Sequence, residues 1–272
     1  MKPYQLGLQH HNPAKSFSGF TLIAPMAHEQ VSLINNGGEV VHRWSLPGAL
    51  GSKAYLLPNG NLLCSVFTRD GERLSGAINI PGALGGRILE LDWLGNIVWE
   101  HTDPNQHHDI RRLANGNTLY LAREEMSEAE AAQIRGGVPG TGLPQPELQG
   151  KMFADVVCEI NPGGKLVWEW RFKDVDPNSF ALAEDCHRGE WAHSNSIAPT
   201  LDGNVLISFR HLDTIAIVDK SSKEIAWSMT DRSWGHQHHA EMLANGNISI
   251  FANGMNNLLQ PLHSRAIELD PR

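Results

Sequence analysis

The chain has 272 residues and a formal net charge of -8, with 41% hydrophobic residues, 19% charged residues and 14 histidines. This composition is that of a globular protein, and the length suits one large all-β domain. Because the balance is acidic and no run of Lys or Arg occurs, nucleic acid and anionic membranes are poor partners for the surface as a whole.

The N-terminal segment contains no continuous apolar stretch of the signal-peptide kind, and no part of the chain is apolar over enough residues to span a membrane. We therefore expect a cytoplasmic location, or a periplasmic one if a leader has been removed. The three cysteines, Cys64, Cys158 and Cys186, show no CxxC spacing. Their odd count argues against a disulfide framework or a zinc–cysteine site.

Hairpin signals begin near the N-terminus. The strand GFTLIAPM is followed by the hairpin EQVSLINNGGEVVHRW, which starts at Glu29. A second kind of hairpin, with an Asn-Gly-Asn turn, runs from Ser52 to Phe67, and the segment from Gly85 repeats the first kind. Apolar strands of period two that are broken by NG or GG turns are typical of β-hairpins.

The two kinds of hairpin then alternate along the rest of the chain. Hairpins with an Asn-Gly-Asn or Asp-Gly-Asn turn run over residues 107–123, 193–210 and 238–253. Hairpins of the other kind start at Ala154 and Asp213, and SRAIELDPR at the end of the chain is a first strand without its partner. These second hairpins end in Trp residues that we expect to pack between repeats: Trp44, Trp99, Trp168 and Trp227.

Two hairpins per repeat make a four-stranded blade, and several blades around an axis make a β-propeller. We therefore predict an all-β fold, with residues 1–272 as a single β-propeller domain. The turn hairpin supplies inner strands A and B of each blade, and the Trp hairpin supplies strands C and D. The repeats give a partial first blade, three full blades and an incomplete fifth, so we expect a C-terminally incomplete propeller that lacks about one further blade.

Two insertions interrupt the repeat. Residues 124–151 join strands B and C of the third blade, starting with a short helix capped by Ser127 and continuing as a Gly/Pro-rich loop. Residues 173–191 join strand D to the next strand A. Long loops beside a site are usually binding loops, and we expect the insertion 124–151 to act as a lid over the mouth of the channel.

Histidines stand at the start of strand A in three blades, as the pair at 107–108, as His193 and as the pair at 238–239. His108 and His238 both lie eight residues before the turn glycine, where the earlier copy has Ser52. Equivalent positions of a repeat converge on its axis, so this pattern predicts an active site that contains His108, His193 and His238.

Two arginines, Arg123 and Arg210, end strand B at the same rim, each seven residues after the turn glycine. An arginine that faces several histidines suits a planar anion such as sulfate, phosphate or carboxylate. We place Arg210 in the catalytic set. The residues expected to support substrate binding are His107, Arg123, Trp191, Asn195, Trp234 and His236.

The residues alone leave two other functions open. His108, His193 and His238 could form a three-histidine site for zinc, iron or copper, and the spacing of His236 and His238 is compatible with a metal. Alternatively, the propeller could be non-catalytic and bind an anionic ligand or a protein. The sequence contains no nucleophilic serine motif or phosphate loop.

The runs WAHSNSI, ISFR, IAIVDKSSKEIAW and HQHHAEMLANGNISIFANG resemble the arylsulfotransferase family, the bacterial aryl sulfate sulfotransferases. HHDIRRLANGN and the GGxVVxW hairpins also resemble that family. The resemblance extends from about residue 29 onward and is sharpest over residues 191–254. It implies a six-bladed propeller and a ping-pong transfer of a sulfuryl group from an aryl sulfate to a phenol, with no cofactor.

The resemblance also implies roles for the site residues. The nucleophilic histidine of the family, which would form a sulfohistidine, falls on His238 after Gln237. The histidine of its His-x-Asn-Ser segment falls on His193, and its Ser-x-Arg arginine falls on Arg210. Another histidine of the family falls on the pair at 107–108. In that scheme His193, His108 and Arg210 would bind the sulfuryl oxygens.

Overall fold

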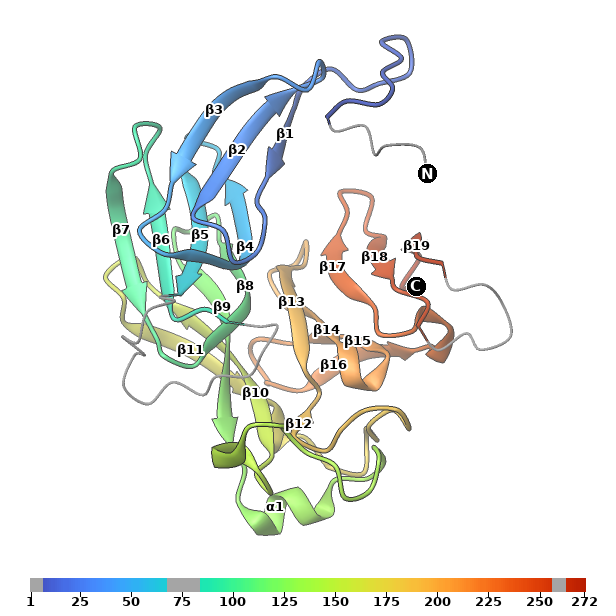
Figure 1. The fold of residues 1–272 in the computed structure, drawn as a ribbon. Coiled ribbons are helices and arrows are strands. Elements are labelled where there is room, and N and C mark those ends of the chain that lie inside the picture. Colours follow the sequence, from blue (N-terminus) through green and yellow to red (C-terminus); the bar gives the residue numbers. More distant parts are fainter. Residues whose placement is uncertain (1–6, 68–83, 256–262) are drawn as a thin grey trace. The chain divides into compact units, whose positions relative to one another are not determined.

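The computed structural model describes residues 7–67, 84–255 and 263–272 (Figure 1). The strands of these residues form five sheets, and the chain divides into an N-terminal unit that ends at Pro104 and a C-terminal unit that starts at Asn105. The fold is an all-β propeller in which each sheet is a blade. Among the described residues, no helix is long and apolar enough to cross a membrane.

The N-terminal unit contains two sheets. The first is β1 (Phe20–Ile23), β2 (Gln30–Asn35) and β3 (Val40–Ser45), and the second is β4 (Ala49–Leu56), β5 (Leu62–Phe67), β6 (Arg87–Leu91) and β7 (Ile97–Thr102). Trp44 of β3 is 1% exposed, and its Nε1 donates a hydrogen bond to the carbonyl of Asp92 at 3.0 Å. The ring therefore packs between the two sheets, as predicted for the Trp of this hairpin.

The C-terminal unit contains three sheets in chain order. Its elements are β8 (Gln106–Arg112), β9 (Thr118–Glu125), β10 (Phe153–Ile160) and β11 (Leu166–Arg171), then β13 (Ser194–Pro199), β14 (Val205–Phe209), β15 (Thr214–Val218) and β16 (Ile225–Thr230), then β17 (His238–Met242), β18 (Ile248–Ala252) and β19 (Arg265–Leu269). The short strand β12 (Glu190–Trp191) pairs in parallel with β10. Strands A to D of the sequence analysis are therefore adjacent in the predicted order.

The number of blades differs from the six that the family resemblance implied. Each blade requires its own pair of hairpins, and the described residues supply strands for five sheets. The first and last sheets have three strands each, and the three between them contain the full A-to-D meander. The repeats predicted the incomplete fifth blade correctly. The expected total of six blades came from the family resemblance and is wrong for the described residues.

Inner strands hold neighbouring blades of the C-terminal unit together, because β13 packs against β8 on one side and β17 on the other. The carboxylate of Asp109 accepts the backbone N–H of Ile197 at 3.0 Å. On the other side, the hydroxyl of Ser196 accepts the backbone N–H of Ala240 at 2.8 Å. These buried bonds fix the relative positions of the strands that begin with the histidine clusters.

The insertion 124–151 begins as predicted, with α1 (Glu128–Gln133) capped by a reciprocal capping box between Ser127 and Glu130. It then passes through a 3-10 turn at Pro146–Leu148. Its backbone is bound to the other insertion, since Val138 N–H donates to the Cys186 carbonyl at 2.8 Å and Leu182 N–H to the Arg135 carbonyl at 3.0 Å. A role for this segment as a lid stays a prediction. The remaining 3-10 turns are Phe172–Asp174, Arg210–Leu212 and Arg232–Trp234.

Candidate functional site

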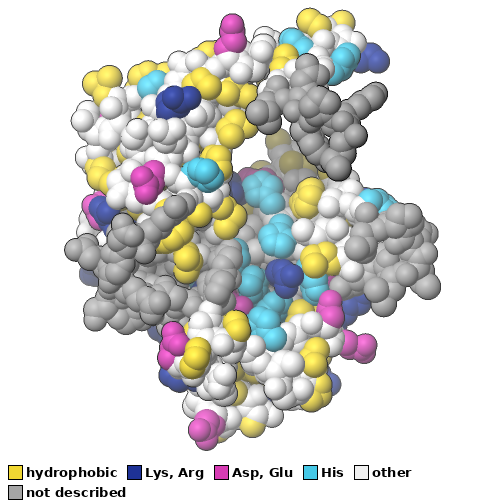
Figure 2. All heavy atoms as spheres, in the orientation of Figure 1, with side chains coloured by type: hydrophobic (Ala, Val, Ile, Leu, Met, Phe, Trp, Pro, Cys, Tyr) yellow, Lys and Arg dark blue, Asp and Glu magenta, His cyan; other side chains and the backbone are white. Residues whose placement is uncertain are grey.

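The predicted site residues all belong to the C-terminal unit, where they stand at or beside the starts of β8, β13 and β17 and the ends of β9 and β14. Figure 2 shows histidine side chains gathered on the face of the molecule that it presents, with a basic side chain among them. Three of the histidines have left-handed backbone at or next to a β-bulge: His108, His193 and His239, with φ of 46°, 51° and 55°. Bulges of this kind re-aim side chains at the ends of strands.

The bulges also change which residues are equivalent. His107 pairs with Leu121 and His238 pairs with Phe251, and each partner lies five residues after its turn glycine. Strand register therefore matches His238 with His107, whereas spacing along the chain matched it with His108. The reason is that the bulge in β8 adds two residues relative to its partner strand, whereas the bulge in β17 adds one.

His238 has one ring nitrogen engaged and one free of these contacts. Its Nδ1 lies 2.9 Å from the carbonyl oxygen of His236 and 2.8 Å from Oδ1 of Asn253. Both partners are acceptors, so Nδ1 carries the proton and Nε2 carries the lone pair of the neutral ring. Burial lowers the pKa of His238, and the charges of Arg210 and His193 lower it further. The ring is therefore neutral at pH 7.

His107 and His108 form a hydrogen-bonded chain that ends on a carboxylate. Nε2 of His107 lies 3.1 Å from the carbonyl of Ala122 and 3.3 Å from Oδ1 of Asp155, so this nitrogen donates. Its Nδ1 lies 2.8 Å from Nδ1 of His108 and must accept that proton. The lone pair of neutral His108 is consequently on Nε2. Its ring lies 4.8 Å from the ring of His193, measured between centroids.

The same burial keeps both rings neutral. Burial lowers the pKa of His107, with Arg123 adding to the effect. Burial lowers the pKa of His108 still further, together with the charges of His193 and His107. His108 is thus a neutral base with an oriented lone pair, and His107 orients it from behind.

Glu190 is a buried carboxylate beside His193 that the repeat pattern does not indicate. Its Oε2 lies 2.9 Å from Nδ1 of His193, and the residue is buried in the short strand β12. Burial opposes ionisation, but His193, Arg123 and His211 together hold the pKa of Glu190 well below its usual value. A buried anion therefore lies directly behind His193.

Two further histidines surround this carboxylate. The ring of His211 is 2% exposed and lies 4.5 Å from the ring of His193, and Nε2 of His187 lies 3.7 Å from Oε2 of Glu190. Burial lowers the pKa of His211 well below its usual value and lowers that of His187. Neither residue has the repeat position, so the spacing signal could not find them. Glu190 itself lies in the insertion 173–191, three residues before His193.

Arg210 is held by its backbone between two site histidines. Its N–H donates to the carbonyl of His193 at 3.1 Å, and its carbonyl lies 3.1 Å from Nδ1 of His236. Among the described residues, its half-buried guanidinium has no hydrogen-bond or ion-pair partner. Arg123, in contrast, is only 4% exposed, and burial lowers its pKa against the opposing charges of Glu190 and Asp155. The accessible positive charge of the pair is therefore that of Arg210.

The other expected binding residues have supporting positions. Asn195 is buried, and its Nδ2 donates to the carbonyl of Gln237 at 2.8 Å, so it fixes the residue before His238. Trp191 and Trp234 are 1% and 2% exposed and belong to hydrophobic clusters. Their burial places both rings in the core beneath the site and away from a ligand-accessible surface.

Two groups of side chains could hold a metal ion among the described residues. They are Asp185, Cys186 and His236, and His187, Glu190 and His211, with ligand atoms within 4.8 Å of one another. The three-histidine set of His108, His193 and His238 is not such a group. The alternative metal site at these three histidines stays a prediction.

A protein-family comparison matches the part of the chain that contains the candidate site. The family model described as Arylsulfotransferase (ASST) matches residues 57–238, which is more than half of the chain. The chain belongs to the arylsulfotransferase family. The matched range includes His108, His193, Arg210 and, at its last position, His238. No curated protein matches this arylsulfotransferase family member.

Solved structures resemble the fold at low identity. Hydrazine synthase of Kuenenia stuttgartiensis aligns with 12% identity and a TM-score of 0.55, covering 93% of this chain and 68% of that one. A protein of unknown function from Bacteroides caccae aligns with 13% identity and a TM-score of 0.51, covering 90% of this chain and 71% of that one. At such identities the likeness extends to the fold alone.

Proposed function

We propose that this arylsulfotransferase family member transfers a sulfuryl group from an aryl sulfate to a phenol through a sulfohistidine on His238. The observation that carries the proposal is the hydrogen bonding of the His238 ring. Two acceptors, the His236 carbonyl and Oδ1 of Asn253, hold the proton on Nδ1. The nucleophilic lone pair is then on Nε2, as an attacking imidazole requires.

In the first half-reaction, Nε2 of His238 attacks the sulfur of the aryl sulfate. A bond forms between nitrogen and sulfur as the bond between sulfur and the aryl oxygen breaks, and the phenolate leaves and takes a proton from solvent. The ring keeps its Nδ1 proton and becomes positively charged. The two oxygens that accept this proton stabilise that charge.

In the second half-reaction, the acceptor phenol attacks the sulfur of the sulfohistidine. The phenol gives its proton to Nε2 of His108, the bond between nitrogen and sulfur breaks, and His238 returns to its neutral form. His108 suits this role because its Nδ1 proton is donated to His107 and its lone pair is on Nε2. His108 then releases this proton to solvent. The release balances the proton that the first phenolate took from solvent.

The sulfuryl oxygens need positive charge and hydrogen-bond donors as the transition state forms. Arg210 supplies a guanidinium that no described carboxylate neutralises, in a fork geometry suited to sulfuryl oxygens. His193 is the second group, because the ionised Glu190 at 2.9 Å stabilises positive charge on its ring. Both residues are joined through the backbone bond from Arg210 N–H to the His193 carbonyl.

The proposal is tested by the intact mass of the purified protein, before and after incubation with a nitrophenyl sulfate and no acceptor. We expect one added sulfuryl group that disappears when a phenol is supplied. The adduct should be absent in His238→Ala and present in His239→Asn, a matched control whose side chain is 58% exposed. An unmodified wild-type mass, or an adduct that persists in His238→Ala, would overturn the proposal.

A further inference from the structure

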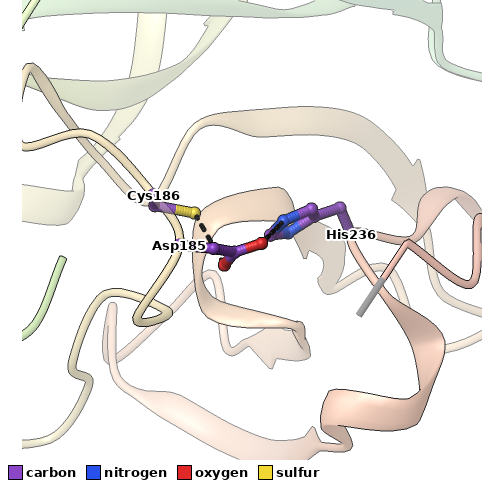
Figure 3. A group of neighbouring side chains, drawn as sticks. All are labelled: Asp185, Cys186 and His236. Atoms are coloured by element: carbon purple, nitrogen blue, oxygen red, sulfur yellow. Dashed lines mark hydrogen bonds and ion pairs between the residues drawn. The ribbon is translucent and has the colours of Figure 1, made fainter. Parts of the chain in front are cut away.

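A second cluster of reactive side chains lies beside the candidate site, and the proposed transfer uses only the backbone carbonyl of one of its residues, His236. It consists of Asp185, Cys186 and His236 (Figure 3). Oδ2 of Asp185 lies 2.9 Å from Nε2 of His236, and its Oδ1 lies 4.0 Å from Sγ of Cys186. Cys186 and His236 are buried, whereas the Asp185 side chain is 54% exposed. The cluster thus has a buried interior and one face open to ions.

The ring of His236 is oriented in the way that a metal ligand requires. Its Nδ1 lies 3.1 Å from the carbonyl oxygen of Arg210 and 3.5 Å from Oδ1 of Asp213, and both of these are acceptors. Histidines that bind metals characteristically donate their other N–H to a backbone carbonyl or a carboxylate. On the other side of the ring, Nε2 donates a hydrogen bond to Oδ2 of Asp185 at 2.9 Å. A metal ion that displaces the proton of this hydrogen bond would gain a nitrogen ligand from His236 and an oxygen ligand from Asp185.

The neighbouring group of His187, Glu190 and His211 lacks this property. Nδ1 of His187 accepts the backbone N–H of Gly189 at 3.1 Å. The proton of the neutral His187 ring is therefore on Nε2, which is the nitrogen that faces Glu190 at 3.7 Å. A metal on this nitrogen would move the ring proton to Nδ1 and break the bond from Gly189, whereas Nδ1 of His236 faces acceptors and can keep its proton.

We propose that Asp185, Cys186 and His236 bind a zinc ion, with water as the fourth ligand. One thiolate, one imidazole nitrogen and one carboxylate oxygen match the ligands that zinc takes in tetrahedral sites. On binding, the sulfur–zinc bond replaces the S–H bond and the proton of the thiol passes to solvent. The inference does not rest on sulfuryl transfer, because none of the three ligands touches the reacting atoms.

The zinc site would join two distant parts of the chain. Asp185 and Cys186 come from the insertion 173–191, and His236 comes from the segment that leads into β17. His236 in turn holds the Arg210 carbonyl. In the metal-free protein, burial and the neighbouring Asp185 raise the pKa of the Cys186 thiol to about 12. The thiol is therefore inert until a metal displaces its proton.

The test uses the full chain, freed of metal and titrated with zinc and with cobalt(II). We expect zinc to be retained at one equivalent, and the cobalt form to show the thiolate-to-cobalt charge-transfer band that only a cysteine ligand produces. Cys186→Ser should lose this band, and Cys158→Ser, a matched control from another buried cysteine of the same unit, should keep it. Near-UV circular dichroism of the metal-free proteins verifies that each variant is folded.

A second variant covers the case in which Cys186→Ser fails to fold. Asp185→Asn changes an exposed carboxylate, so it should fold normally and lose zinc to a chromogenic chelator that the wild type resists. A wild-type protein that binds no zinc would overturn the proposal. A charge-transfer band that persists in Cys186→Ser, or zinc retention in Asp185→Asn equal to that of the wild type, would also overturn it. All of these readouts are independent of sulfuryl transfer.

Discussion

Oε2 of Glu190 accepts a hydrogen bond from Nδ1 of His193 at 2.9 Å, and this pair joins a buried anion to the candidate anion-binding site. Burial opposes ionisation of this carboxylate, and the surrounding positive groups hold its pKa well below the usual value. In return, it fixes the orientation of the His193 ring through Nδ1. The geometry repeats the arrangement in which a buried acid orients a catalytic histidine.

The first prediction concerns the charge of Glu190. Glu190→Gln retains an oxygen acceptor of nearly the same shape but removes the negative charge. We expect kcat for aryl sulfate turnover to fall by up to about 100-fold, because His193 then stabilises the sulfuryl oxygens less well. The nitrogen chemical shifts of the His193 ring should change in the same variant, and activity equal to that of the wild type would contradict the role assigned to the charge.

The second prediction concerns stability against pH. Burial holds the pKa values of His108 and His211 well below their usual value, so the unfolded chain binds more protons than the folded one as the pH falls. Their contribution to the free energy of unfolding is complete above the unfolded pKa of about 6.5. It is lost as the pH falls from there toward the pKa values of the folded protein. Each of these two histidines adds up to about 1.4 kcal/mol per pH unit to the slope of the free energy of unfolding against pH.

Urea unfolding between about pH 8 and pH 5 measures this slope, because the usual histidine pKa lies inside that range. In His211→Asn, the free energy of unfolding should change less with pH than in the wild type. The ionised Glu190 acts in a lower window, since its pKa is depressed: its contribution is present above about pH 4.3 and is lost as the pH falls through the folded value. Stability that does not change between pH 8 and pH 5 would contradict neutral buried histidines.

The third prediction concerns Arg210. Arg210→Ala should lower kcat/KM for the aryl sulfate by about 10²–10³-fold, the loss typical of removing one charge-stabilising donor from a transition state. Arg210→Lys keeps the charge but not the planar fork and should recover only part of the activity. Inorganic sulfate should inhibit the wild type and inhibit Arg210→Ala far less. Equal inhibition of both proteins would show that the anion binds elsewhere.

The fold could be predicted from sequence because its signals are local. The NG, GG and DG turns and period-two strands identified the hairpins, and the Ser127–Glu130 spacing identified the cap of α1. Each signal depends on residues close together in the chain. The blade count of six was the exception, since it came from the family and not from the repeats of this chain.

The site was predictable only as far as the repeat extends. His108, His193, His238 and Arg210 were selected because they stand at recurring strand starts and ends, and their roles stay predictions. Glu190, in contrast, lies in an insertion and has no repeat position, although it precedes its partner His193 by only three residues. The equivalence of His107 with His238 was also missed, because a bulge adds residues without a sequence signal. The register of a bulged strand depends on which residues bulge, and spacing along the chain does not encode that.

The last prediction concerns Asn253, which holds the proton on Nδ1 of His238 from 15 residues away in the chain. Asn253→Ala removes one of the two acceptors, and a hydrogen bond of this kind is worth about 1 kcal/mol. The other tautomer of the ring should then gain population, and the rate of sulfohistidine formation should fall by about fivefold. Asn253→Asp is the matched control, because its carboxylate accepts the same proton and should preserve the tautomer. Nitrogen-15 spectra of the ring report the tautomer directly. If Asn253→Ala changes neither the tautomer nor the single-turnover rate, the hydrogen bonding of Nδ1 does not control the reactivity of His238. The assignment of His238 as the nucleophile would then lose its structural basis.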